Sequence, residues 1–115
     1  MSFMTDTDLE PILSDNRQEP DDTKLVLAPF AEHCLTPVGY DLRVGRTYTS
    51  SDLGKVRNDL KEGEAITLQP STTALISTLE YVRMPKDKTI TGLIESKVSQ
   101  VSRGLSHVST TVDPD

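Results

Sequence analysis

Short apolar and β-branched runs, separated by glycine, proline and polar residues, make up most of the chain after residue 24. Runs of this length are typical of β-strands, and no apolar stripe with helical spacing persists for three turns. The pattern therefore predicts an all-β domain with one or two short helical turns. The expected strands cover residues 24–27, 40–44, 46–49, 65–68, 73–82, 90–94 and 108–112.

The residues between the runs indicate which strands are neighbours. A single glycine, Gly45, separates one pair of runs, and a turn at Pro70 separates another. Short connections of this kind join antiparallel strands. We therefore expect two paired sets, residues 40–44 with 46–49 and residues 65–68 with 73–82.

Helical turns are expected at two places. Thr7 or Asp8 is a candidate cap for one turn near the N-terminus, and a second turn over residues 99–104 ends in a glycine. The polar interval 50–63 is interpreted as a loop or as one weak helix around residues 53–60.

Composition limits the size of the core. The chain has 115 residues, of which 35% are hydrophobic, and only five are aromatic. We expect an acidic, partly flexible segment over residues 1–24, followed by one β domain over residues 25–115. Because so few apolar residues are available, we expect partner chains to help bury the core.

The net charge of −6 narrows the choice of ligands. Binding along a nucleic-acid backbone needs clustered lysine and arginine, so DNA and RNA are not expected partners. A nucleotide needs only a few local cations and backbone donors, and it remains compatible with this charge.

The cysteine content and the hydropathy of the chain indicate the cellular compartment that we expect. Cys34 is the only cysteine, so no intrachain disulfide and no multi-cysteine metal site is possible. His33 beside it supplies only a second ligand, too few for zinc. The sequence shows neither a signal peptide nor a run long enough to span a membrane, and we expect a soluble, cytoplasmic protein without membrane contact.

Several short motifs then follow one another in a fixed order. The motifs are Ile-Leu-Ser-Asp at 12–15, Gly-Tyr-Asp-Leu-Arg-Val-Gly at 39–45, Leu-Gln-Pro at 68–70, Thr-Leu-Glu-Tyr-Val-Arg-Met-Pro at 78–85, the segment 92–105 and Val-Asp-Pro at 112–114. The Gly-Tyr-Asp-Leu-Arg-Val-Gly string is the most specific of them, since the others would be weak alone. Together they resemble the dCTP deaminase and dUTPase superfamily, with the deaminase branch closer.

This resemblance implies a distorted jelly-roll domain of the β-clip, dUTPase-like type that assembles as a homotrimer, with each nucleotide site at a subunit interface. It also implies a deoxynucleoside triphosphate, dCTP or dUTP, as ligand. Deamination of dCTP on the family pattern needs no metal or other cofactor, whereas Mg²⁺ can accompany a bound triphosphate.

The resemblance assigns site-organising roles to Tyr40, Asp41 and Arg43. In the family, residues at these positions organise the site and the subunit contacts and do not take part in the chemistry. A plainer interpretation of the same residues is a tight turn into a strand whose Asp41 and Arg43 face solvent.

The family's phosphate-binding segment reads Arg-Ser-Ser-x-x-Arg-x-Gly-Leu, and residues 97–105 depart from it. Lys97 stands at the first arginine, Ser99 at the second serine and Ser102 at the second arginine, while a valine replaces the first serine. Lysine keeps the charge without the bidentate fork of arginine. Arg103, one position along, is a candidate replacement for the missing cation.

Asp113 is the candidate catalytic carboxylate, because it stands at the aspartate of the family's third motif. The deaminase branch places a glycine turn and a glutamate proton shuttle after this motif. Here Asp115 stands at the glycine position and no glutamate follows, so we expect the chain to be catalytically incomplete. His107 lies nearby, but a lone histidine is more often packed or solvent-facing than catalytic.

Three functions stay open on these residues. The first is an enzyme of pyrimidine deoxynucleotide metabolism that hydrolytically deaminates dCTP to dUTP. The second is a non-catalytic trimeric module on the same scaffold that senses a nucleotide or binds a protein. The third is a structural β domain with no nucleotide site, which the family residues at Lys97, Ser99 and Asp113 disfavour.

Overall fold

The structure is a computed structural model that describes residues 3–18, 22–51, 54, 56–105 and 111–112. These residues form short strands in several small sheets, with only brief helical segments between them. The observed elements confirm the all-β class expected from the pattern of apolar runs.

The elements have the following bounds in chain order. The helical segments are α1 (Asp6–Leu9), η1 (Glu10–Ile12), η2 (Glu32–Cys34) and α2 (Val98–Val101). The strands are β1 (Leu13–Ser14), β2 (Leu25–Ala28), β3 (Leu35–Thr36), β4 (Gly39–Tyr40), β5 (Val44–Ser50), β6 (Asn58–Asp59), β7 (Ala74–Thr78), β8 (Tyr81–Arg83), β9 (Gly92–Leu93) and β10 (Thr111–Val112).

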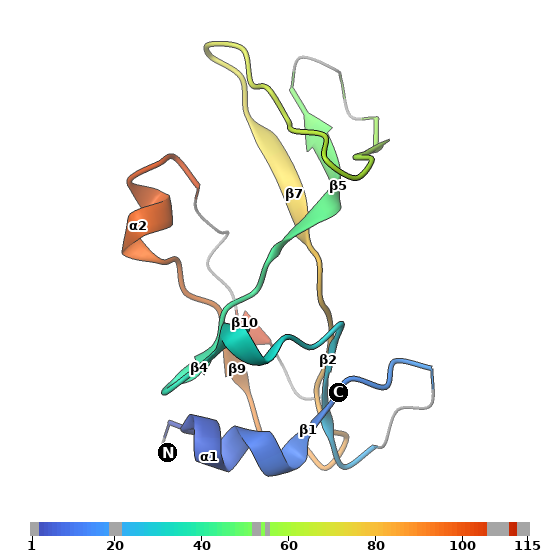
Figure 1. Ribbon diagram of the computed structural model, residues 1–115, viewed down its shortest axis with the longest axis vertical. Coiled ribbons are helices and arrows are strands. Elements are labelled where there is room, and N and C mark those ends of the chain that lie inside the picture. The colour runs from blue at the N-terminus through green and yellow to red at the C-terminus, as the bar shows by residue number, and fades with distance from the viewer. Residues whose placement is uncertain (1–2, 19–21, 52–53, 55, 106–110, 113–115) are drawn as a thin grey trace.

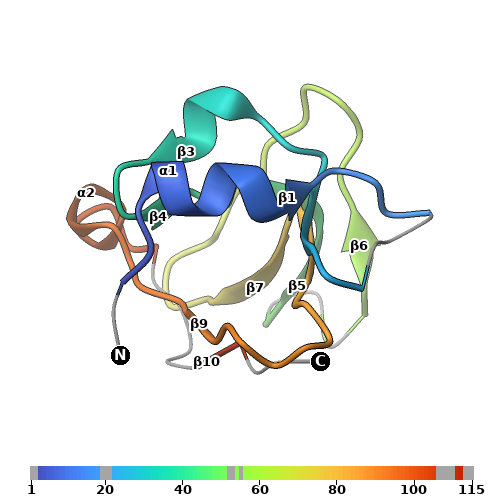
Figure 2. The same cartoon turned by 90° about the horizontal axis from the view of Figure 1, so that it is seen from below.

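The core gathers around β2, the central strand of a sheet ordered β1-β2-β8. All four of its residues are buried, and β1 pairs with one edge and β8 with the other. Leu25 and Leu27 pack with Met84 and with Leu9 at the end of α1. Figure 2 looks at this end of the molecule and shows α1 leading into β1.

The N-terminal residues therefore supply part of the core. The predicted caps Thr7 and Asp8 are wrong, because Thr5 is the N-cap of α1 and Asp8 occupies the third helical position. The Asp8 carboxylate accepts hydrogen bonds from the backbone N–H and the hydroxyl of Thr5, each at 3.0 Å, which lowers the pKa of Asp8. The boundary between residues 1–24 and 25–115 stays a prediction.

A second sheet, ordered β6-β5-β7, rises away from the core. Figure 1 shows β5 and β7 extending together toward the end of the molecule opposite α1. The radius of gyration is 15.8 Å, whereas a compact domain of this length has about 13 Å. The projecting strand pair leaves large apolar side chains open to solvent, with Val44 56% and Leu75 71% exposed.

Gly45 stands where β5 changes its register with β7. Val44 is opposite Thr78, but Tyr48 is opposite Ile76, so β5 has two more residues than β7 across this interval. A Cβ atom on Gly45 would lie 2.6 Å from the carbonyl oxygen of Thr78 and 2.7 Å from that of Ser77. Only a residue without a side chain allows this approach of two backbones.

Two of the predicted strand pairings are wrong. Residues 40–44 and 46–49 do not pair, because Gly45 lies within β5 and β5 pairs with β6 and β7 instead. Residues 65–68 form no strand. The predicted strand 73–82 is divided into β7 and β8 at Leu79, and these two belong to different sheets.

The remaining local predictions fare better. Residues 24–27 correspond to β2, residues 90–94 contain β9, and the turn that ends in glycine is α2. Gly104 has a φ of +91°, the left-handed conformation expected where a helical segment stops. A weak helix around residues 53–60 is wrong where the structure describes it, since Asn58–Asp59 is a strand.

Substituting Gly45 tests the close approach of β5 and β7. Gly45→Ala should lower the free energy of unfolding by about 1–3 kcal/mol, because its methyl group meets rigid backbone. Gly39→Ala is the matched control, since a Cβ atom there meets nothing within 4 Å. Urea unfolding measures the stability of both variants. Equal stabilities would contradict the close approach of the β5 and β7 backbones at Gly45.

Candidate functional site

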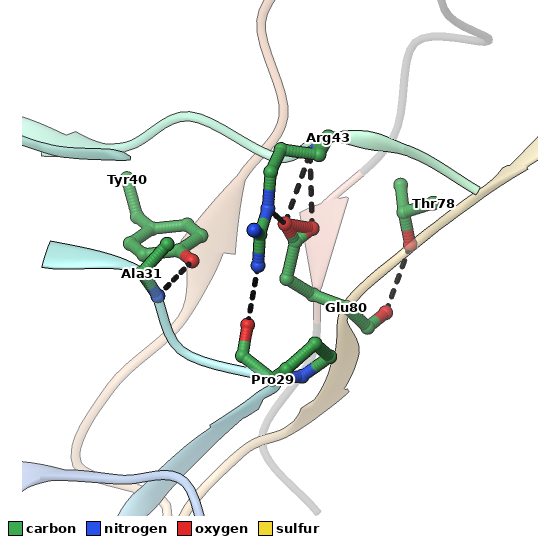
Figure 3. Close-up of polar contacts among 6 residues, drawn as sticks. All are labelled: Pro29, Ala31, Tyr40, Arg43, Thr78 and Glu80. Carbon is green, nitrogen blue, oxygen red and sulfur yellow. Dashed lines mark hydrogen bonds and ion pairs between the residues drawn. The ribbon is translucent and has the colours of Figure 1, made fainter. Parts of the chain in front are cut away.

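An ion pair with a buried carboxylate joins the motif at residues 39–45 to the motif at residues 78–85. The side chain of Glu80 is fully buried, and its Oε1 accepts a hydrogen bond from Arg43 Nε at 2.8 Å. The backbone N–H of Arg43 donates to the same carboxylate, at 3.0 Å to Oε1 and 2.9 Å to Oε2 (Figure 3). Both carboxylate oxygens are therefore satisfied by one residue.

Arg43 also ties this pair to the core sheet. Its terminal nitrogen donates to the carbonyl of Pro29, directly after β2, at 2.6 Å (Figure 3). Its own carbonyl accepts from the N–H of Leu79 at 2.8 Å. Glu80 is held in turn by Thr78, whose hydroxyl donates to the Glu80 carbonyl at 3.0 Å. The hydrogen bond to Glu80 raises the pKa of Arg43.

Tyr40 secures the other end of the same segment. Its hydroxyl accepts a hydrogen bond from the N–H of Ala31 at 3.1 Å (Figure 3). The centroid of its ring lies 5.6 Å from that of the Phe30 ring. Burial is the main reason that the pKa of Tyr40 is raised. Tyr40 and Arg43 thus anchor the residues between them to the chain after β2.

Asp41, between these two anchors, faces the predicted phosphate segment. Lys97 Nζ lies 2.7 Å from Asp41 Oδ2, and the two side chains are 58% and 37% exposed. The backbone N–H of Asp41 donates to the carbonyl of Cys34 at 2.8 Å. Residues 56 positions apart in the sequence are therefore brought together at a solvent-accessible ion pair.

The other predicted phosphate-binding residues lie on or after α2. Lys97 directly precedes this helix, and its carbonyl accepts from the N–H groups of Gln100 and Val101. The Ser102 hydroxyl donates to the Ser99 carbonyl at 2.9 Å, while Arg103 is exposed just beyond. The assignment of Ser99, Ser102 and Arg103 to phosphate stays a prediction.

Asp113 and His107 lie outside the described residues, so the predicted catalytic role of Asp113 also stays a prediction. The strand just before Asp113 is described: Thr111 is opposite Leu93 and Val112 is opposite Gly92. This pairing brings β10 beside the strand that leads toward Lys97 (Figure 1).

Metal ligands do not gather in the described ranges. No three histidine, cysteine or carboxylate side chains there lie close enough together to hold an ion. Cys34 is buried and unpaired in η2, next to His33. Within the same ranges, no helix is long and apolar enough to cross a membrane.

Glu80 lies within the motif at residues 78–85, but the sequence alone predicts no role for it. The sequence holds one signal that could have revealed it, namely a glutamate between Leu79 and Tyr81 in a strand-forming run. A buried carboxylate requires a cation or several donors nearby. Its partner could not be chosen from sequence, because Arg43 is 37 residues away.

Comparison with known proteins identifies the family of this chain. The model of a family described as dCTP deaminase-like matches residues 12–115. The chain belongs to the dCTP deaminase-like family. That match contains both halves of the Arg43–Glu80 pair and the Asp41–Lys97 contact.

Curated relatives that are similar to this chain are named dCTP deaminases. The dCTP deaminase of Thermococcus kodakarensis is 37% identical over 92 residues, which cover 79% of this chain and 56% of the relative. That of Pyrococcus horikoshii is 38% identical over 91 residues, 79% of this chain and 55% of the relative. That of Haemophilus ducreyi is 39% identical over 90 residues, 74% of this chain and 44% of the relative.

The chain thus spans about half the length of the curated relatives that it matches. No solved structure matches it.

Removing the charge of Glu80 tests the importance of the buried pair in this dCTP deaminase-like domain. Glu80→Gln should lower the free energy of unfolding by about 2–4 kcal/mol, because an amide turns a donor toward the Arg43 guanidinium and cannot neutralise it. Glu62→Gln, at an exposed position, is the control and should change stability by less than about 0.5 kcal/mol. Equal denaturation midpoints for the two variants would show that the pair contributes nothing.

Proposed function

We propose that this chain binds the triphosphate of a deoxynucleotide, dCTP or dUTP, as part of a dCTP deaminase. The observation that carries the proposal is the contact between two motif segments, through Asp41 and Lys97, next to the Arg43–Glu80 anchor. The names of the relatives support dCTP as the substrate, since they are dCTP deaminases from archaea and from a bacterium.

In this proposal the segment around α2 binds phosphate oxygens. Lys97 supplies an ammonium group with three donors, Ser99 a hydroxyl and Arg103 a second cation. Asp113 supplies a carboxylate to the sugar or to the attacking water. Hydrolytic deamination also needs a general acid–base group to move protons at the cytosine ring. Mg²⁺ enters only with the triphosphate, as part of the substrate.

Assembly as a homotrimer belongs to the same proposal. The β5–β7 pair projects from the core and exposes Val44 and Leu75, while Val56 and Leu93 are also more than half exposed. Apolar side chains left exposed on a projecting strand pair support contact with another chain. Because the chain has a single cysteine, the cytoplasm is the expected compartment. Because acidic residues are in excess, nucleic acid is not an expected partner.

A second candidate function is a module that binds the nucleotide without converting it. The observation in its favour is the sequence at residues 98 and 102, where valine and serine stand at family serine and arginine positions. Loss of a hydroxyl and of a guanidinium fork reduces phosphate contacts while leaving the scaffold in place.

Calorimetry and a turnover assay test the proposal. The chain should bind dCTP more tightly than deoxycytidine, and Lys97→Gln should weaken dCTP binding by about tenfold, the usual effect of losing one charge-assisted contact. Lys61→Gln, an exposed lysine beyond β6, is the control. Equal affinities for dCTP and deoxycytidine would exclude triphosphate recognition. Release of ammonia from dCTP by the longest natural form distinguishes the enzyme from the binding module.

Restoring the family residues gives a gain-of-function test of the second candidate. The variant Lys97→Arg, Val98→Ser, Ser102→Arg should bind dCTP about tenfold more tightly, because two guanidinium forks and a hydroxyl are regained. A control that places glutamine instead of arginine at residue 102 matches the length without the charge. Tight binding and efficient turnover by the unmodified chain would contradict the non-catalytic candidate.

A further inference from the structure

We propose that Asp41 is an internal competitor for Lys97, which lowers the affinity of the site for polyphosphate and so sets how strongly anionic ligands are held. The inference rests on the proposed function, because it takes Lys97 as a phosphate-binding cation. It adds that the same cation is engaged by a carboxylate of this chain.

The geometry of the contact supports competition. Lys97 Nζ donates to Asp41 Oδ2 at 2.7 Å, which is the length of a direct charge-assisted hydrogen bond. The Lys97 side chain is 58% exposed, so an anion from solution can reach the ammonium group. The incoming phosphate oxygen and the Asp41 carboxylate would then share one cation.

Asp41 cannot move far when an anion arrives. Its backbone N–H is bonded to the carbonyl of Cys34, a residue that is only 5% exposed. Two residues later, Arg43 is fixed by the buried Glu80 carboxylate. Tyr40, the preceding residue, is fixed by its hydroxyl. The carboxylate is therefore carried by backbone that is anchored on both sides, and its negative charge stays near any anion bound to Lys97.

The size of the effect follows from the exposure of the pair. Unit charges about 4–5 Å apart in a water-like environment interact weakly, and salt screens them further. A polyphosphate carries several charges, but most of them lie farther from the carboxylate. Removing the Asp41 charge should therefore strengthen binding of a polyphosphate by about threefold to tenfold at low salt, and by less at physiological ionic strength.

A positioning role for Asp41 makes the opposite prediction. If the carboxylate served mainly to hold Lys97 ready for phosphate, its removal would free the lysine chain and weaken binding. The sign of the change in affinity therefore decides between competition and positioning.

The experiment is a double-mutant cycle in the full 115-residue chain, with inorganic tripolyphosphate as the probe. Asp41→Asn keeps the side-chain shape and removes the charge, Lys97→Gln removes the cation, and the double variant combines them. Asp15→Asn is the control, because it removes an equal charge from an exposed position in the N-terminal segment. Calorimetry at low salt, and again at about 0.15 M, gives the affinities, and thermal melts establish that each variant is folded.

The expected result is that Asp41→Asn binds tripolyphosphate more tightly than the unmodified chain, that Asp15→Asn does not, and that the gain disappears without Lys97 and shrinks with salt. Unchanged or weaker binding by Asp41→Asn overturns the inference, whether or not the unmodified chain binds measurably. An equal gain in the Lys97→Gln background also overturns it, because the effect would then be one of net charge. The proposed function can fail while this inference holds. That is the outcome if the chain binds dCTP no better than deoxycytidine but Asp41→Asn still gains affinity for tripolyphosphate.

Discussion

The carboxylate of Glu80 needs donors, because it is fully removed from solvent and carries a charge that the interior cannot otherwise tolerate. Arg43 meets this need twice, with its side chain and with its backbone N–H. The backbone contact matters most for the fold, since it fixes the path of the chain as well as one side chain. Once that path is fixed, β5 must start against β7, and no room remains for a side chain on Gly45.

This dependence explains which elements could be predicted from sequence. The run at β2 and the glycine that ends α2 are set by neighbouring residues, and both were predicted close to their observed positions. The sequence around Gly45 predicts a break between two strands, because a glycine that flanks an apolar run usually is one. Its actual role comes from a strand that is distant in sequence. Residues 65–68 have the composition of a strand but find no partner among the described residues.

Some features of the candidate site could likewise be predicted from sequence and others could not. The family resemblance assigns the segments around Asp41 and Lys97 to one nucleotide site, and that assignment stays a prediction. The structure shows that Lys97 Nζ lies 2.7 Å from Asp41 Oδ2. Motif order could not predict that the two residues bind each other, nor that Glu80 holds Arg43, because pairing across tens of residues depends on tertiary geometry. The predicted solvent-facing position of Arg43 is only partly right, since its side chain is 31% exposed and bonded at the head group.

The pairing of β9 with β10 has a consequence for chain entropy. These two short strands join residues 92–93 to 111–112, so the intervening stretch that carries Lys97 and α2 is a loop closed at its base. Most of the entropy cost of closing a loop is incurred when its ends meet, and it grows only slowly with length. In this chain the two-residue β9–β10 ladder closes the loop. An anion bound by several residues of this loop would therefore contact a segment whose two ends are already held together. Opening the ladder would weaken anion binding even though every residue that contacts the anion is unchanged.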